Sequence, residues 1–269
     1  MKKFSRMLLA SDFDATLTNS QGDIPENSKA AIRYFVENGG YFSVSTGRTA
    51  EGFHRFEPGL MNAPLLFANG AAAVDCTTGK TVFSETVDSA AVGLLNAIIE
   101  EYPSLSVECY GVNGKSYCLN TDGRSRNHFK NLQIEYSEVK AFDEVAFPLV
   151  KIMLSAGERS AEIQRFLGNT DMGNVKFIPC SGDYIELIST FAGKGRGLLR
   201  LASLLGVPDC GVFAVGDGAN DVDMLEAAAL SFAPSSGDIM ALNAADITVC
   251  GCDSGAVADV IAILDRRLH

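Results

Sequence analysis

A chain of 269 residues in which 47% are apolar and 20% are charged can build a full hydrophobic core, which excludes a disordered protein. Its net charge of −11 argues against a binding surface for nucleic acid or for anionic lipid. A small phosphorylated substrate stays possible, because a cation bound in a pocket reverses the local field.

The cysteines and the N-terminus indicate the compartment. None of the seven cysteines forms a CxxC pair, and Cys250 and Cys252 have no partner at zinc-binding spacing, so we expect buried, reduced thiols. The apolar run before Asp12 is too short for a signal peptide, and no stretch approaches the roughly 20 residues of a membrane span. We therefore expect a soluble, cytoplasmic protein. Whether it is a monomer or a dimer stays open.

The first third of the chain alternates strand and helix patterns. In chain order, it predicts a strand at about 7–12, a helix at 27–38, a strand at 41–45, a helix after Arg48 and a strand at 65–68. The glycines at 39 and 40 supply the stop signal of the first helix. This βαβαβ order is typical of a parallel, right-handed, doubly wound sheet.

The middle third has hairpins in place of βα alternation. It predicts helices at about 88–102, 122–131 and 158–168, and strands near 105–110, 115–119, 149–154, 174–179 and 183–188. The last third predicts helices at about 194–205, 220–228 and 255–267 and a strand at 211–215. We therefore predict an α/β fold with a Rossmann-like, doubly wound parallel sheet core at 1–84 and 189–269, and an α+β cap inserted at 85–188.

Four aspartates lie just beyond two apolar strands. Asp12 and Asp14 follow the first strand, and Asp217 and Asp221 follow the strand at 211–215. Parallel sheets place their ligands at the carboxyl ends of their strands, so we expect the four side chains to meet. Because four carboxylates repel one another, this arrangement predicts a hard divalent cation such as Mg²⁺.

The segment Asp12–Thr16 has the residues for phosphoryl transfer. One carboxylate can attack a phosphoryl group, and the other can protonate the leaving oxygen and later take a proton from water. Taken alone, a solvated turn with helix-capping acids explains the same residues equally well.

Three further segments suit anions or a cation. Ser45–Arg48 places a hydroxyl and backbone N–H groups at an expected helix start, where an anion binds, although a simple N-cap is the alternative. Lys194 begins a helix between glycines and can reach a phosphate, although a surface lysine is the alternative. Gly216–Asp221 offers several oxygens to one cation without the spacing of an EF-hand, and an ordinary turn is its alternative.

Taken in order, these motifs resemble those of the haloacid dehalogenase superfamily of aspartyl-phosphate phosphohydrolases. The matching segments are Asp12–Thr16, Ser45–Arg48, Lys194 and Gly216–Asp221. The resemblance spans the whole chain and is closest to the Cof-type branch, which has a large α+β cap between the second and third motifs. The segment Phe67–Ala71 adds to the likeness.

The resemblance implies a role for each motif. Asp12 becomes phosphorylated as the nucleophile, and Asp14 is the general acid and base. Mg²⁺ is held by Asp12, Asp217 and the backbone carbonyl of Asp14, with Asn220 and Asp221 beside it. The catalytic set also includes Thr46 and Lys194, which hold the phosphoryl group. The implied substrate contacts are Thr46, Gly47, Arg48, Asn69, Lys194 and Asn220.

One position departs from the family pattern. The family usually has glycine where this chain has Ala15. If the backbone there has a positive φ, alanine strains the loop by about 1 kcal/mol or more. We expect this to affect the rate rather than the mechanism.

The resemblance therefore predicts a Mg²⁺-dependent phosphatase for small phosphorylated metabolites, sugar phosphates above all. A phosphomutase and a non-catalytic phosphate-binding regulatory protein are alternatives, and a dehalogenase fits less well because it does not need Asp14 together with the metal cluster. The cap closes over the core and selects the substrate in this family. Its candidates, each with a solvated surface role as the alternative, are Arg124, Arg126, His128, Lys151, Tyr184 and Glu186. Lys151 stands out, because a charge within an apolar strand needs a partner or an opening.

Overall fold

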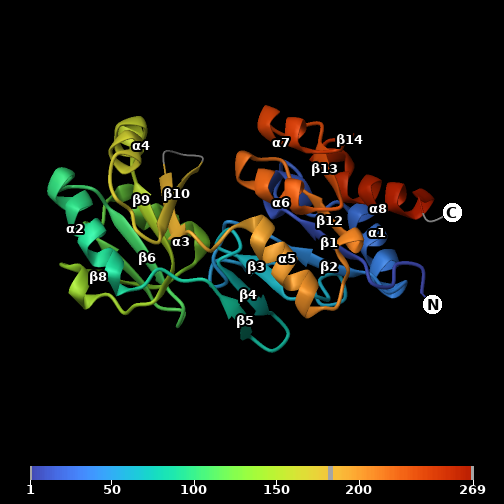
Figure 1. Ribbon diagram of the computed structural model, residues 1–269, viewed down its shortest axis with the longest axis horizontal. Coiled ribbons are helices and arrows are strands. Elements are labelled where there is room, and N and C mark those ends of the chain that lie inside the picture. The colour runs from blue at the N-terminus through green and yellow to red at the C-terminus, as the bar shows by residue number, and fades with distance from the viewer. Residues whose placement is uncertain (1, 181–183, 268–269) are drawn as a thin grey trace. The chain divides into compact units, whose positions relative to one another are not determined.

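The computed structural model describes residues 2–180 and 184–267 and divides into two compact units (Figure 1). The first unit contains Met1–Gly47, Arg55–Phe83 and Gly193–His269, and the second contains Arg48–His54 and Ser84–Ala192. Residues 48–54, which the sequence assigns to the core, thus belong to the second unit. The division of catalysis and substrate choice between the two parts stays a prediction.

The first unit is built on a five-stranded sheet in the order β14-β13-β12-β1-β2, in which all neighbouring strands are parallel. The strands are β1 Leu8–Ser11, β2 Tyr41–Val44, β12 Val212–Val215, β13 Leu230–Pro234 and β14 Ile247–Val249. β1 lies between β12 and β2 and is buried along its whole length, which explains its unbroken apolar run. The predicted parallel α/β core is confirmed, although β13 and β14 were not predicted.

The helices of the first unit are α1 Glu26–Glu37, α5 Lys194–Leu204, α6 Val222–Ala227, α7 Ile239–Ala244 and α8 Ala256–Arg267. Leu201 of α5 and Met224 of α6 pack with Leu8 of β1 in one buried apolar cluster. α1 and α8 pack against each other, and Tyr34 of α1 donates a hydrogen bond to Asp265 of α8 at 3.0 Å. The sequence predicted all of these helices except the short α7.

A small sheet of β3 Leu65–Phe67, β4 Ala72–Asp75 and β5 Lys80–Ser84 follows β2 in the chain. β3 joins β2 through a parallel bridge between Ser45 and Leu66, but its regular pairing is antiparallel, with β4. The chain reverses directly after β3, and an antiparallel neighbour needs only such a short connection. β4 and β5 were not predicted.

The helix expected after Arg48 is absent, because residues 46–64 form turns and irregular backbone. Gly47, Pro58 and other glycines and prolines of this segment oppose a helix. The predicted helix start at Ser45–Arg48 is therefore wrong, whereas an anion site at these residues stays a prediction.

The second unit is an α+β unit with a six-stranded sheet in the order β10-β11-β9-β6-β7-β8. Its neighbouring strands are antiparallel except β7 and β8. Its elements are α2 Val92–Glu101, β6 Val107–Gly111, β7 Ser116–Leu119, α3 Gly123–Leu132, β8 Tyr136–Val139, β9 Leu149–Ser155, α4 Ser160–Gly168, β10 Val175–Cys180 and β11 Tyr184–Ser189. The half-exposed β8 was not predicted, and residue 183, where the last predicted strand begins, lies outside the described residues.

The sheet of the second unit has one apolar and one polar face. Val107, Ile152 and Ile185 belong to a buried cluster with side chains of α2 and α4. Alternate residues of a strand point to opposite faces, so Glu108 and Lys151 lie on the other side of this sheet. Among all described residues, no helix is long and apolar enough to cross a membrane.

Candidate active site

The two acidic loops meet because their strands are neighbours. β1 and β12 are parallel with Ser11 opposite Val215, and the backbone N–H of Asp12 donates to the Val215 carbonyl at 2.8 Å. Both strands end at this pair. The loops that follow them therefore leave the same edge of the sheet, which is where open α/β sheets bind ligands.

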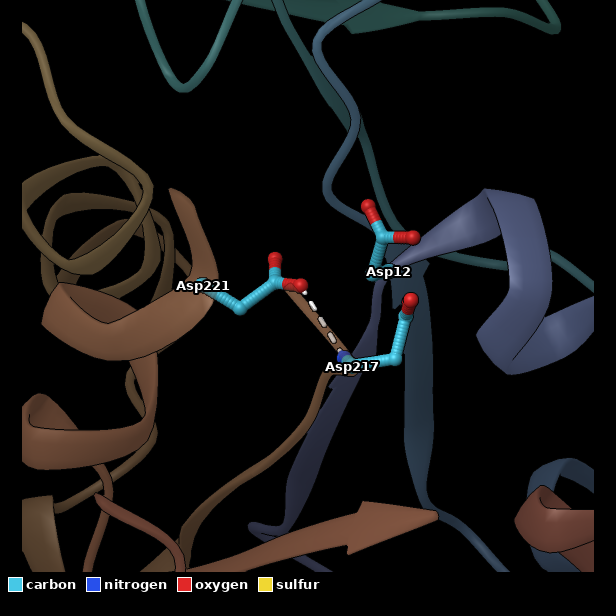
Figure 2. Close-up of side chains that lie close together, drawn as sticks. All are labelled: Asp12, Asp217 and Asp221. Carbon is cyan, nitrogen blue, oxygen red and sulfur yellow. Dashed lines mark hydrogen bonds between the residues drawn. The ribbon is translucent and has the colours of Figure 1, made fainter. Parts of the chain in front are cut away.

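The carboxylates of Asp12, Asp217 and Asp221 form a cluster, here termed the acidic triad (Figure 2). One oxygen of each side chain lies within 4.8 Å of the other two. Asp12 and Asp221 are buried, and Asp217 is partly buried. Figure 2 shows Asp12 directly after β1, Asp217 on the loop after β12 and Asp221 on the short helical turn that follows, with the three carboxylates around a common space.

Lys194, the first residue of α5, inserts its ammonium among these acids. Its Nζ donates hydrogen bonds to Oδ1 of Asp12 and to Oδ1 of Asp221, and the residue is 1% exposed. Burial disfavours the charged amine, but the two carboxylates outweigh burial and raise the pKa of Lys194 above its usual value. The ammonium is therefore retained, and the alternative of a surface lysine does not hold, because Lys194 is buried.

The site is short of positive charge. Burial raises the pKa of Asp12, against the opposing effect of Lys194, and Asp221 raises it further. Burial also raises the pKa of Asp217. When all three carboxylates are ionised, they and the one ammonium give the site a net charge of about −2, which is the state that the raised pKa values of Asp12 and Asp217 oppose. A bound divalent cation balances that charge and favours the ionised acids.

The free oxygens of the acidic triad fit such a cation. Both oxygens of Asp221 already accept hydrogen bonds, Oδ1 from Lys194 and Oδ2 from the backbone N–H groups of Asp217 and Gly218, at 3.1 and 3.0 Å. Within the described residues, Oδ2 of Asp12 and Oδ2 of Asp217 have no hydrogen-bond partner. These two oxygens suit direct coordination by a hard cation, whereas Asp221 suits a supporting role.

Two further residues, Thr16 and Gly216, shape this geometry. The hydroxyl of Thr16 donates to Oδ1 of Asp217 at 2.5 Å and fixes that carboxylate. At Gly216, a Cβ would lie 2.5 Å from the Cβ of Asp221, so glycine lets the loop fold back on itself. The sequence showed Thr16 only as the end of its loop. The spacing Asp-x-Asp-x-Thr was the available signal.

Asp14 lies outside the acidic triad. Its side chain is exposed, so the expected meeting of four carboxylates is realised by three. The next residue, Ala15, has φ 58° and ψ 8°, which is the left-handed conformation that the usual glycine adopts freely. The condition for strain at Ala15 is therefore met.

The remaining candidate residues of the first unit differ in how far they are buried. Thr46 and Asn69 are buried, with 1% and 2% of their surface exposed. Asn220 is exposed, and its Nδ2 donates to Oδ1 of Asn69 at 3.1 Å. Gly47 is partly buried, and the partly buried Arg48 belongs to the second unit.

In the second unit, Lys151 has a partner. Its ammonium donates to Oε1 of Glu186 at 3.1 Å, and both residues are buried. The ammonium also lies 5.3 Å from the ring centre of Tyr110. The expected need of this charge for a partner is therefore satisfied within the polar face of the sheet. Arg124 and Arg126 are exposed on α3.

A second polar group on this face contains a residue that the sequence did not indicate. Glu108 is fully buried, and its Oε2 accepts hydrogen bonds from Tyr110 at 2.5 Å and from Nδ1 of His128 at 2.7 Å. His128 also contacts the ring of Tyr184, with 5.3 Å between ring centres. The contact with Glu108 is made by Nδ1 of His128, so Nε2 is the ring nitrogen that is not used in this bond.

Comparison with known proteins agrees with the fold and the site. Residues 9–261 match the family model of haloacid dehalogenase-like hydrolases. A putative phosphatase of Haemophilus influenzae is 26% identical over 83% of this chain and 84% of its own length. The 5-amino-6-(5-phospho-D-ribitylamino)uracil phosphatase YbjI of Escherichia coli is 26% identical over 94% of both chains. The solved structure of the HAD subclass IIB sugar phosphatase BT4131 is 16% identical and has a TM-score of 0.83 over 96% of this chain and 98% of its own.

The chain belongs to the haloacid dehalogenase-like hydrolase family. The resemblance read from the four motifs is confirmed, as is the Cof-type, subclass IIB architecture with an inserted cap. The protein is a phosphatase of this family, that is, a phosphoric monoester hydrolase.

The left-handed Ala15 gives a test of loop strain. We expect Ala15→Gly to raise the free energy of unfolding by roughly 0.5–1 kcal/mol, because the relief of strain exceeds the entropy that glycine adds to the unfolded chain. The matched control is Ala30→Gly on the exposed side of α1, which we expect to lower the free energy of unfolding by about 1 kcal/mol. Urea denaturation followed by circular dichroism measures both. Equal losses in the two variants would show that Ala15 is unstrained.

Proposed function

We propose that this protein hydrolyses phosphomonoesters of small metabolites with Mg²⁺ and through an aspartyl phosphate on Asp12. The observation that carries the proposal is the environment of Asp12: Lys194 donates a hydrogen bond to its Oδ1, and its carboxylate belongs to the acidic triad, while Oδ2 accepts no hydrogen bond from the described residues. A carboxylate with one oxygen fixed and the other open is oriented for attack on phosphorus.

The first half-reaction transfers the phosphoryl group to the protein. An oxygen of Asp12 attacks phosphorus, and the bond from phosphorus to the ester oxygen breaks with its electron pair going to that oxygen. Asp14, which is exposed and lies two positions after Asp12 in the chain, donates the proton that makes the leaving group an alcohol. Lys194 and Thr46 hold the phosphoryl oxygens, and the ammonium offsets the charge of the transition state.

The second half-reaction restores the carboxylate. Water attacks the aspartyl phosphate, Asp14 takes the proton of that water, and the bond between phosphorus and the oxygen of Asp12 breaks. Inorganic phosphate leaves, and Asp14 returns to its protonated form. The same side chain thus acts as acid and then as base.

Mg²⁺ suits the free oxygens of Asp12 and Asp217, and its two positive charges balance the excess negative charge of the site. The backbone carbonyl of Asp14 is a third proposed ligand, with Asp221 and Asn220 in support. When bound, Mg²⁺ neutralises charge on the phosphoryl group and on the attacking carboxylate. Thr16 keeps Asp217 in place for this role.

For the substrate, we propose a phosphomonoester of a polyhydroxylated carbon chain, such as a sugar phosphate. The names of two related proteins support it, because one is a phosphatase of a phosphorylated ribityl compound and the other is a sugar phosphatase. The polar face of the second unit, with Glu108, Lys151 and His128, suits hydroxyl groups. The substrate contacts of Gly47, Arg48, Asn69 and Asn220, a cytoplasmic location and the oligomeric state stay predictions from the sequence.

Replacement of the nucleophile tests the covalent route. We expect Asp12→Asn to lower kcat for p-nitrophenyl phosphate by at least about 10³-fold, because an amide does not form the acyl phosphate. Acid-quenched wild type should carry phosphate on Asp12, detectable by mass spectrometry of the peptide. The control is Asp143→Asn, which changes an exposed carboxylate of the second unit and should keep full activity. Turnover that survives Asp12→Asn excludes the aspartyl phosphate.

Removal of the metal tests the cation site. Hydrolysis should stop in EDTA and return with Mg²⁺, and Asp217→Asn should weaken Mg²⁺ binding by at least about tenfold, because it removes one of two free carboxylate oxygens. Calorimetric titration of the protein with MgCl₂ measures binding without substrate. Unchanged turnover in EDTA, or equal Mg²⁺ affinity in Asp217→Asn, contradicts the assignment.

A substitution at His128 tests the substrate class. If Nε2 of His128 accepts a hydrogen bond from a substrate hydroxyl, His128→Ala should lower kcat/KM for sugar phosphates roughly tenfold through KM, with little change for p-nitrophenyl phosphate. The matched control is His54→Ala in the same unit, since the Nε2 of His54 already bonds the Leu132 carbonyl. Equal changes in kcat/KM for sugar phosphates and for p-nitrophenyl phosphate would show that His128 does not select the substrate.

A further inference from the structure

A turn with unusual backbone geometry follows β3. Ala68, Asn69 and Gly70 have φ of 50°, 52° and 80°, so three consecutive residues are left-handed and two of them carry a side chain. The N–H of Ala71 donates to the Ala68 carbonyl at 3.1 Å and closes this left-handed turn (residues 68–70). Such conformations are costly for residues other than glycine and persist where surrounding contacts hold them.

Asn69 ties two of the site loops together. Its backbone N–H donates to the Thr46 carbonyl at 3.0 Å, and its Oδ1 accepts from Nδ2 of Asn220 at 3.1 Å. Asn69 is 2% exposed, whereas Asn220 is exposed. A buried amide that bonds both loops is better placed to hold them than to contact a substrate.

Gly70 packs on the start of α5. A Cβ at this position would lie 2.2 Å from the Gly193 carbonyl oxygen and 3.1 Å from the Cα of Lys194. The same Gly193 carbonyl accepts the hydrogen bond of the Gly197 N–H at 2.8 Å, at the first turn of the helix. Since Lys194 bonds Asp12, displacement of the helix start moves the ammonium away from the nucleophile.

We propose that the left-handed turn is a positioning element, which sets Thr46, Lys194 and Asn220 relative to Asp12. Asn69 and Gly70 act through these residues and govern kcat rather than substrate affinity, because misplacement of reacting groups raises the barrier of the chemical step. The kinetic part of this inference rests on the proposed function. The structural part is measurable without turnover.

The first test compares two glycines with the same backbone strain. Gly70→Ala and Gly79→Ala both place a side chain at positive φ, with φ of 80° and 70°, but a Cβ at Gly79 meets no atom within 4 Å. We expect Gly70→Ala to lower kcat for p-nitrophenyl phosphate at least about tenfold with KM nearly unchanged. Gly79→Ala should keep the wild-type kcat. Equal losses in both variants would overturn the proposal.

A second variant covers the case in which Gly70→Ala does not fold. Asn69→Gly keeps the left-handed backbone and the N–H bond to Thr46, and removes the side-chain bond to Asn220. We expect kcat to fall about tenfold in Asn69→Gly, with no further fall in the double variant Asn69→Gly/Asn220→Ala relative to Asn220→Ala alone. Asn69 would be a substrate contact if Asn69→Gly raised KM and if the effects of Asn69→Gly and Asn220→Ala multiplied in the double variant. That result would overturn its positioning role.

Hydrogen–deuterium exchange separates this proposal from the proposed function. Peptides covering residues 190–197 should exchange faster in Gly70→Ala than in wild type, those covering 216–222 faster in Asn69→Gly, and neither faster in Gly79→Ala. Unchanged exchange overturns the positioning role whatever the activity. Absence of turnover and of Asp12 phosphorylation in the wild type overturns the proposed function alone.

Discussion

The candidate site depends on one ammonium buried among like charges. Lys194 bonds Asp12, 182 positions away in the chain, and Asp221, 27 positions away. Without it, two buried carboxylates face each other uncompensated, and breaking a buried ion pair in this way costs roughly 3–5 kcal/mol. The first unit consists of separate stretches of the chain, so the site is complete only after those stretches have folded together.

The single ammonium of Lys194 does not balance the negative charge of the acidic triad. The excess of negative charge suits a divalent cation, and the open oxygens of Asp12 and Asp217 give such a cation its ligands. The other oxygens are fixed by Thr16, Lys194 and backbone N–H groups. Catalysis of phosphoryl transfer depends mainly on positioning the reacting groups and on balancing the charge of the phosphoryl group. Here, residues at the ends of two parallel strands provide both.

The parts that sequence could predict are those with a local signature. Buried strands followed by acids were read correctly, because the apolar run and the motif are contiguous in the chain. The helix expected after Arg48 was an error of local interpretation, since the glycines and prolines of residues 46–64 already oppose a helix. The bond of Thr16 to Asp217 joins residues 201 positions apart, so the spacing Asp-x-Asp-x-Thr can indicate Thr16 but not its partner. The exclusion of Asp14 from the acidic triad likewise follows from loop geometry.

Backbone strain at this site has two different consequences. Ala15 and Ala68 are both left-handed and belong to loops of the site, where strain is held by the rigid strands before them. Ala15 is exposed, so the cost of replacing the usual glycine is conformational and the loop tolerates it. Gly70 differs, because the Gly193 carbonyl occupies the place of a side chain. A departure from the family pattern is therefore compatible with the site at position 15, whereas position 70 admits a side chain only if the start of α5 moves.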